Sequence, residues 1–230
     1  HLTETSAELE QRTEPNSAAS MAMSPLVSTI AVQDFETSPA TPTWTISAGS
    51  GNISTDTGSG DVPASQRIRG GSRSWQVNGA TATLDLASIS ISGYTGVTAT
   101  VHISSTANNG SSGADVGDSV RVFAALNGGA FPATADITVT GNNNARWSYN
   151  NTVNDTTTAG TPISSSGTAG TNQGTIHSTL EVNIPNGTTS VALRIIAVND
   201  LGNEIWNVDD VTLTTTGATP TATSTNTPTS

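Results

Sequence analysis

The stretches SVALRIIAVND, residues 190–200, and IWNVDDVTL, residues 205–213, decide the fold. Between positions 191 and 197 every second residue is apolar, which is the pattern of a strand with one buried face. The linking segment Asn-Asp-Leu-Gly-Asn is rich in turn formers, so we expect the two stretches to form an antiparallel hairpin. A hairpin this apolar is expected at the centre of a β-sandwich.

The turn end of this predicted hairpin is crowded with polar and acidic side chains. They are Asn199, Asp200, Asn203, Glu204, Asp209 and Asp210. This acidic end is the best sequence candidate for a chemical site.

The rest of the chain predicts more short strands, separated by loops rich in Gly, Ser, Asn and Asp. Apolar alternation or β-branched runs occur at residues 26–36, 82–91, 97–104, 118–126, 135–140 and 175–184. Only 33% of the residues are hydrophobic, and strong helix formers are scarce. About ten to twelve short strands without a helix of normal length indicate an all-β fold, a two-sheet antiparallel sandwich.

The chain divides into three parts by composition. Residues 1–26 are polar and offer too little apolar surface to fold alone, so we expect an extended N-terminal arm. Residues 27–217 carry the predicted strands and form the sandwich domain. Residues 218–230 are a low-complexity Thr/Pro sequence, which is typical of a linker or stalk.

The charge of the chain argues against nucleic acid as a partner. The formal net charge is −11, and all seven basic residues are arginine. The nearest approach to a basic patch is Arg67, Arg69 and Arg73, which lie among acidic neighbours, whereas a phosphate backbone needs clustered basic groups. No run approaches the ~18 apolar residues of a membrane span.

Compartment is indicated by cysteine usage and by the N-terminus. The chain has no cysteine, and it begins at His1 without Met or a signal peptide. We therefore expect a secreted bacterial protein at the cell surface, stabilised by core burial rather than by disulfides. Its N-terminus is expected to be already processed, either by native maturation or by artificial trimming.

Candidate catalytic residues are few. With three histidines and no cysteine, a nucleophile–base pair has few possible parts. His102 and His177 lie on alternating strands among Thr and Ser, where we expect them to be exposed. Glu181 and Glu204 could lie in one cleft as a glycosidase-like acid pair, but nothing in their surroundings indicates it. We therefore predict that the protein is not an enzyme.

Seven short motifs in fixed order carry a resemblance to a known group of folds. They are DFE (34–36), QRIR (66–69), SWQ (74–76), GYTGVT (93–98), GDSVRV (117–122), ARWS (145–148) and NEIWNVDDV (203–211). In this order the chain resembles the jelly-roll modules of secreted bacterial proteins, which are related in shape to concanavalin-like and carbohydrate-binding domains. The resemblance covers roughly residues 27–215 and implies a jelly-roll sandwich.

The resemblance also implies a calcium ion, because such modules often carry a structural calcium that bridges the first and last strands. The matching positions are Asp34, Glu36, Asp209 and Asp210. Calcium takes six to eight oxygen ligands, and Asp34 and Glu36 share one strand face. Asp209 and Asp210 are expected on opposite faces, so only one of them would join directly. The alternative is that all four are solvated strand-end acids.

Aromatic residues and sequons indicate possible contact with sugars. Trp147 and Tyr149 are two positions apart beside a long loop, so they share a strand face and could form a stacking platform; packing in the core or at an edge is the alternative. Five Asn-x-Ser/Thr sequons, all in predicted loops, are candidate glycosylation sites: Asn52, Asn109, Asn150, Asn154 and Asn186.

Two functions compete at this point. One is a structural subunit of an extracellular surface assembly or filament, which self-associates when the N-terminal arm contacts a neighbour. Residues 20–32 contain alternating apolar residues that could add to a neighbour's open sheet edge. The other is a carbohydrate-binding or adhesion module of a larger secreted protein, for which glycans would be the partners.

Overall fold

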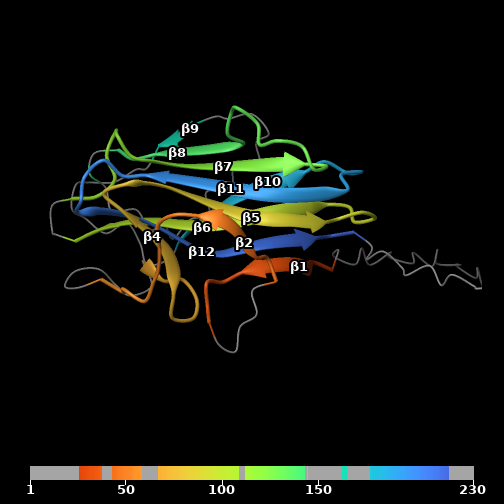
Figure 1. Ribbon diagram of the computed structural model, residues 1–230, viewed down its shortest axis with the longest axis horizontal. Coiled ribbons are helices and arrows are strands. Elements are labelled where there is room, and N and C mark those ends of the chain that lie inside the picture. The colour runs from red at the N-terminus through yellow and green to blue at the C-terminus, as the bar shows by residue number, and fades with distance from the viewer. Residues whose placement is uncertain are drawn as a thin grey trace, which may run out of the picture.

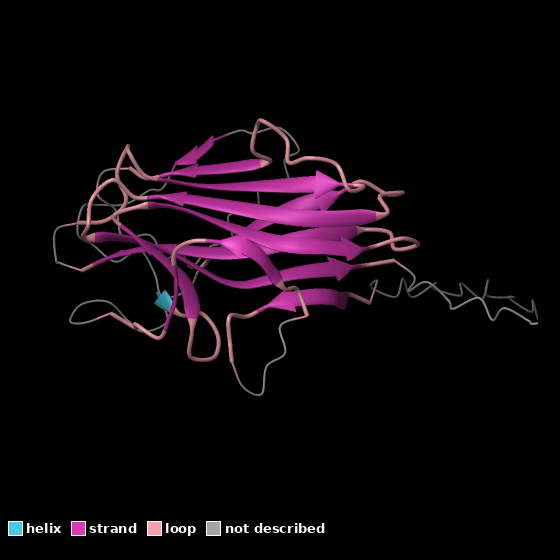
Figure 2. Cartoon of the chain, in the orientation of Figure 1, coloured by secondary structure: helices cyan, strands magenta, loops and turns pink. Residues whose placement is uncertain are grey.

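The computed structural model describes residues 26–37, 43–58, 67–108, 112–142, 144, 162–164 and 177–217. Within these ranges all the elements are strands, apart from a short helical piece at Arg67 that is cyan in Figure 2 (Figures 1 and 2). The strands are β1 (Ser28–Gln33), β2 (Ile46–Gly49), β3 (Asn52–Ser54), β4 (Ser74–Asn78), β5 (Thr81–Ser90), β6 (Val97–Ala107), β7 (Ser119–Leu126), β8 (Ile137–Thr140), β9 (Pro162–Ser164), β10 (Ser178–Ile184), β11 (Ser190–Val198) and β12 (Glu204–Thr215). The same ranges contain no helix that is long and apolar enough to cross a membrane.

The strands form two sheets, which confirms the predicted all-β sandwich. The first sheet has the order β10-β6-β12-β4-β3, and β1 also pairs with β12. The second has the order β2-β5-β11-β7-β8-β9. Pairing is antiparallel except between β8 and β9. Strand β12 pairs with β6 along most of its length, while β4 and β1 take its other edge near its start and its end.

The predicted hairpin of residues 190–213 is wrong, although both strands are central. Strand β11 lies between β5 and β7 in the second sheet, and β12 belongs to the first. The turn after β11 therefore crosses from one sheet to the other. The two strands are both strongly apolar because their inner faces meet across the core, not because they pair side by side.

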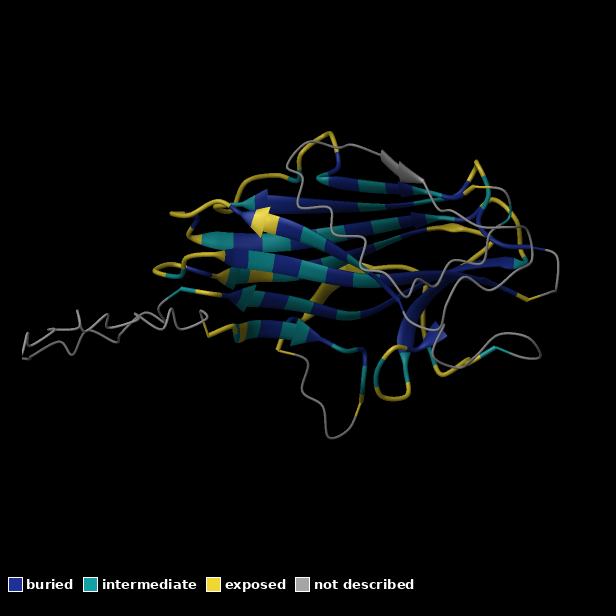
Figure 3. Ribbon diagram, turned by 180° about the vertical axis from the view of Figure 1, so that it is seen from behind, coloured by how far each residue is buried: buried dark blue, intermediate teal, exposed yellow. Residues whose placement is uncertain are grey.

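The core lies between the two sheets and follows the alternation in the sequence. Along β11, Val191, Leu193, Ile195 and Ala197 are fully buried, and the residues between them are only partly buried. On β12, Trp206 and Leu213 are also fully buried. Figure 3 shows this alternation of buried and half-buried residues along the strands. Trp206 is therefore a core residue.

The two ends of the sandwich differ. Ser28, at the start of β1, pairs with Thr215, at the end of β12, so the described parts of the domain begin and finish side by side. Glu204 starts β12 at the other end, roughly 36 Å away at about 3.3 Å per residue (Figure 1). The acidic turn predicted from the sequence therefore lies at the end opposite the two termini of the domain.

Candidate metal centre

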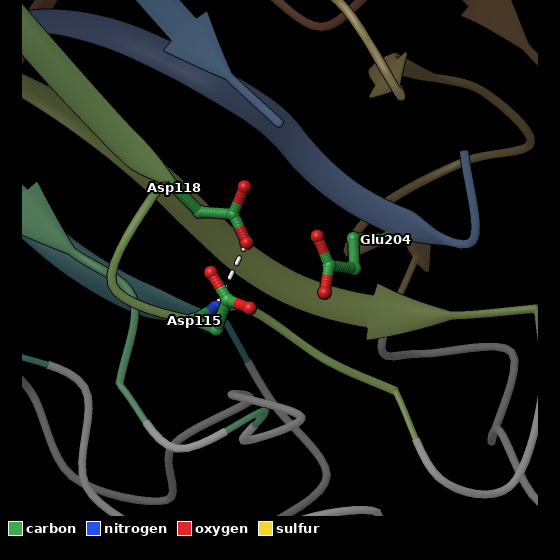
Figure 4. Close-up of side chains that lie close together, drawn as sticks. All are labelled: Asp115, Asp118 and Glu204. Carbon is green, nitrogen blue, oxygen red and sulfur yellow. Dashed lines mark hydrogen bonds between the residues drawn. The ribbon is translucent and has the colours of Figure 1, made fainter. Parts of the chain in front are cut away.

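Three carboxylates meet at this far end of the sandwich. Glu204 is the first residue of β12 in one sheet, and Asp118 directly precedes β7 in the other. Asp115 lies in the loop that leads to β7. Each residue offers a carboxylate oxygen, and these oxygens lie within 4.8 Å of one another (Figure 4). The group therefore spans the two sheets.

Backbone groups hold two of the acids in place. The N–H of Asp115 donates to Asp118 Oδ2 at 2.8 Å, and the N–H of Gly117 donates to Asp115 Oδ1 at 3.0 Å. The second oxygen of Asp118, Oδ1, accepts the N–H of Asp200 at 3.0 Å. The Asp118 side chain thus joins its own loop to the β11–β12 turn.

Glu204 is the exception, because no donor group satisfies it. Its side chain is 0% exposed, and among the described residues neither carboxylate oxygen accepts a hydrogen bond from an N–H or hydroxyl group; the side chain that it contacts is another acid, Asp118. Burial, together with the neighbouring negative charge of Asp118, raises the pKa of Glu204 to about 8. Burial also raises the pKa of Asp118. None of the three ion pairs between described residues includes these acids.

A bound cation would satisfy this arrangement. A buried carboxylate without a donor or a counter-charge is strongly destabilising. An ion bound by several hard oxygens satisfies all three acids at once, and calcium prefers such ligands. The group contains neither Cys nor His, the ligands that favour zinc. The buried group of Asp115, Asp118 and Glu204 could therefore hold a metal such as calcium.

The four residues predicted to bind calcium lie elsewhere, around the segment that precedes β4. Glu36 Oε1 accepts the N–H groups of Ser72 and Arg73, both at 2.7 Å. Asp34 Oδ1 accepts the N–H of Glu36 at 3.2 Å. The Glu36 carboxylate thus fastens the segment before β4 to the end of β1.

The second half of that predicted set lies at a bulge in β12. Asp209 Oδ2 accepts the N–H groups of Arg69 and Gly70 at 2.7 and 3.1 Å, and Asp210 forms an ion pair with Arg69 at 2.5 Å. Within the described ranges these carboxylates supply no group of three ligand oxygens within 4.8 Å. Calcium at Asp34, Glu36, Asp209 and Asp210 stays a prediction, and their hydrogen bonds show a different role, which is to anchor residues 69–73.

The two histidines are less exposed than predicted, and Glu181 and Glu204 do not form the acid pair that was considered. His177, directly before the edge strand β10, is buried. His102 is half-buried, with Nδ1 3.0 Å from the carbonyl of Asp210, because its strand β6 lies between β10 and β12. Glu181 pairs with Thr100 of β6, whereas Glu204 pairs with Ala107 of the same strand. These positions are roughly 23 Å apart along β6 at ~3.3 Å per residue, so the two glutamates do not share a cleft.

The predicted sugar contacts are largely outside the part of the chain that the structure describes. Five of these residues lie outside the described ranges: Trp147, Tyr149, Asn109, Asn150 and Asn154. Asn52 begins β3 instead of lying in a loop. Asn186 lies in the exposed turn after β10, where its Oδ1 accepts the N–H of Gly96 at 3.0 Å. Glycosylation at either position stays a prediction.

Sequence reasoning found one of the three acids of the metal centre and missed the others. Glu204 belonged to the predicted acidic turn, but Asp115 and Asp118 had not been singled out. The available signal was the segment GADVGDSV, which places two acids three positions apart in a Gly-containing loop directly before a strand. Their closeness to Glu204 depends on strand pairing that no local motif reveals.

Fold and site together define a β-sandwich module with a buried acidic centre at one end. No family model and no curated protein matches the chain. Among solved structures, the K3 cleaved adhesin domain of Lys-gingipain (Kgp) from Porphyromonas gingivalis w83 is 17% identical, with a TM-score of 0.43; the match covers 82% of this chain and 98% of that domain. A family 16 carbohydrate binding module-2 is 13% identical, with a TM-score of 0.31, and the match covers 65% of this chain and 81% of that module. Likenesses this distant carry no functional argument.

Proposed function

We propose that this chain is a non-catalytic extracellular adhesion or carbohydrate-binding module that holds a structural calcium ion at Asp115, Asp118 and Glu204. The observation that carries the proposal is the fully buried Glu204 carboxylate, which has no N–H or hydroxyl donor among the described residues and faces two more acids. Extracellular modules bind calcium with dissociation constants of about 10⁻⁴–10⁻³ M, in the range of calcium outside cells. A calcium-dependent module therefore fits a secreted protein.

The layout of the domain supports a tethered module. Both described ends of the sandwich, at Ser28 and Thr215, lie together, and a Thr/Pro-rich sequence follows the last strand. A domain attached through this end presents the opposite end, with the acidic centre and its loops, to a partner. Binding sites are commonly carried by loops that a rigid scaffold positions.

Two observations support a non-catalytic role. Ser104 Oγ and His177 Nε2 are 3.4 Å apart, but both residues are buried, so no substrate reaches this pair. Asp118 and Glu204 are likewise buried, which suits an ion ligand and not an acid pair that must contact a sugar. The other reading, a self-associating filament subunit, depends on residues 1–26, nearly all of which lie outside the described part, and it stays a prediction.

Calcium is expected to raise the melting temperature of the full chain and a chelator to lower it. A ligand that binds only the folded state adds RT ln(1 + [L]/Kd), about 2.7 kcal/mol at one hundred times Kd. Differential scanning calorimetry with calcium chloride or EDTA measures the shift, and Glu204→Gln is the control that should lose it. Equal melting temperatures in both conditions would disprove the ion, and a glycan array without hits would favour adhesion to another class of partner.

A further inference from the structure

A fourth carboxylate, that of Asp200, lies against the acidic centre. Asp200 is an exposed residue of the β11–β12 turn, and its N–H already donates to Asp118 Oδ1 at 3.0 Å. The Asp200 carboxylate is not part of the group of oxygens that lie within 4.8 Å of one another, so its side chain would have to turn toward Asp115 and Asp118 to reach the same ion.

Gly117 shows where the Asp200 carboxylate points. A Cβ atom built at Gly117 would fall well inside van der Waals contact with Asp200 Oδ2, and it would lie 3.5 Å from Asp115 Oδ1. The Asp200 and Asp115 carboxylates therefore approach the same point beside the Gly117 backbone. The missing side chain of Gly117 leaves the room that Asp200 occupies.

We propose that Asp200 is the fourth protein ligand of the calcium ion, and that the ion ties the β11–β12 turn to the loop before β7. This inference rests on the calcium site proposed above. The fully buried Glu204, whose oxygens find no donor in the described part of the chain, supplies the inner side of the site. Asp115, half-buried, and Asp200, exposed, supply the outer side. Four carboxylates offer up to eight oxygens, enough for the six to eight that calcium takes.

The geometry gives the ion a structural task. The β11–β12 turn is where the chain crosses from the second sheet to the first, and Asp118 precedes β7, the neighbour of β11. An ion bound by Asp200, Glu204 and Asp118 fixes this crossing to the loop beside it. Asp115 and Asp200 would form the side of the site from which calcium approaches, because they are its less buried members.

The test measures calcium affinity by isothermal titration calorimetry on the full chain after removal of metal with a chelator. Asp200→Asn and Gly117→Ala are each expected to weaken calcium binding at least tenfold. Gly117→Ala is the sharper variant, since it keeps all four acids and changes only the place of the Asp200 carboxylate. Gly117 does not have a positive φ, so alanine fits its backbone.

Gly202→Ala is the matched control, because a Cβ at this position in the same turn meets nothing within 4 Å. Its calcium affinity should equal that of the wild type. Melting of each variant in EDTA should match the wild type and so show that the fold is intact. Unchanged affinity in both Asp200→Asn and Gly117→Ala would overturn the fourth ligand and leave the three-acid site standing. A wild-type chain that binds no calcium would overturn the site itself.

Discussion

Replacing Trp206 with alanine is expected to lower the free energy of unfolding by ~3–5 kcal/mol, the usual cost of truncating a buried aromatic residue. Trp206 is 0% exposed and lies on the inner face of β12. Its indole Nε1–H donates to the carbonyl of Val198, at the end of β11, at 3.0 Å. The ring therefore fills the core and also joins the two sheets, so alanine leaves a cavity and removes a bond between the sheets.

Guanidinium denaturation measures this change, and two further variants separate its causes. Trp206→Phe keeps most of the ring volume but loses the donor, so it should cost about 1–2 kcal/mol. Val116→Ala, at a side chain that is 83% exposed, should change the free energy by less than ~0.5 kcal/mol. A loss below ~1 kcal/mol for Trp206→Ala would show that the ring is not part of the core.

The success of the fold prediction and its one large error have the same origin. Alternation along residues 191–197 identifies the face of β11 that is buried, because side chains of a strand point to opposite faces in turn. It does not identify the strand alongside. Leu193 pairs with Leu86 of β5 and with Ala124 of β7, both far away in the sequence. Two apolar strands joined by a short turn have the same sequence pattern whether they pair within one sheet or face each other across a core.

The acidic centre was partly predictable for a similar reason. Glu204 belongs to a turn that is visibly acidic in the sequence, but its partner Asp118 is 86 positions earlier in the chain. The two come together only because β12 and β7 start at the same end of different sheets. Asp209 and Glu36, by contrast, have carboxylates of the kind that calcium binds. In the structure these carboxylates accept hydrogen bonds from backbone N–H groups of residues 69–73. Such hydrogen bonds leave no trace in a sequence motif.

Without metal, the free energy of unfolding is expected to fall as the pH rises from about 4.5 to about 8. Glu204 has a pKa of about 8 in the folded chain, against 4.5 as its ordinary value. Between these values the folded state keeps the proton and the unfolded state releases it. The folded state therefore binds more protons, and each such group lowers stability by up to ~1.4 kcal/mol per pH unit. Asp209, with a pKa raised by burial to about 7, adds to the fall at lower pH.

Denaturant unfolding in EDTA between pH 5 and pH 8.5 measures this slope, with Glu204→Gln as the neutral variant of nearly equal shape. Between pH 7 and pH 8 the free energy of unfolding of the wild type should fall because of Glu204 alone, since Asp209 titrates below that interval. The variant should therefore show no fall between pH 7 and pH 8. At pH 8 in EDTA, Glu204→Gln should be more stable than the wild type, since it buries no charge. In saturating calcium the order should reverse, because only the wild type then gains from the ion. If the wild type is the more stable protein in both solutions, Glu204 is satisfied without a cation and the metal centre is wrong.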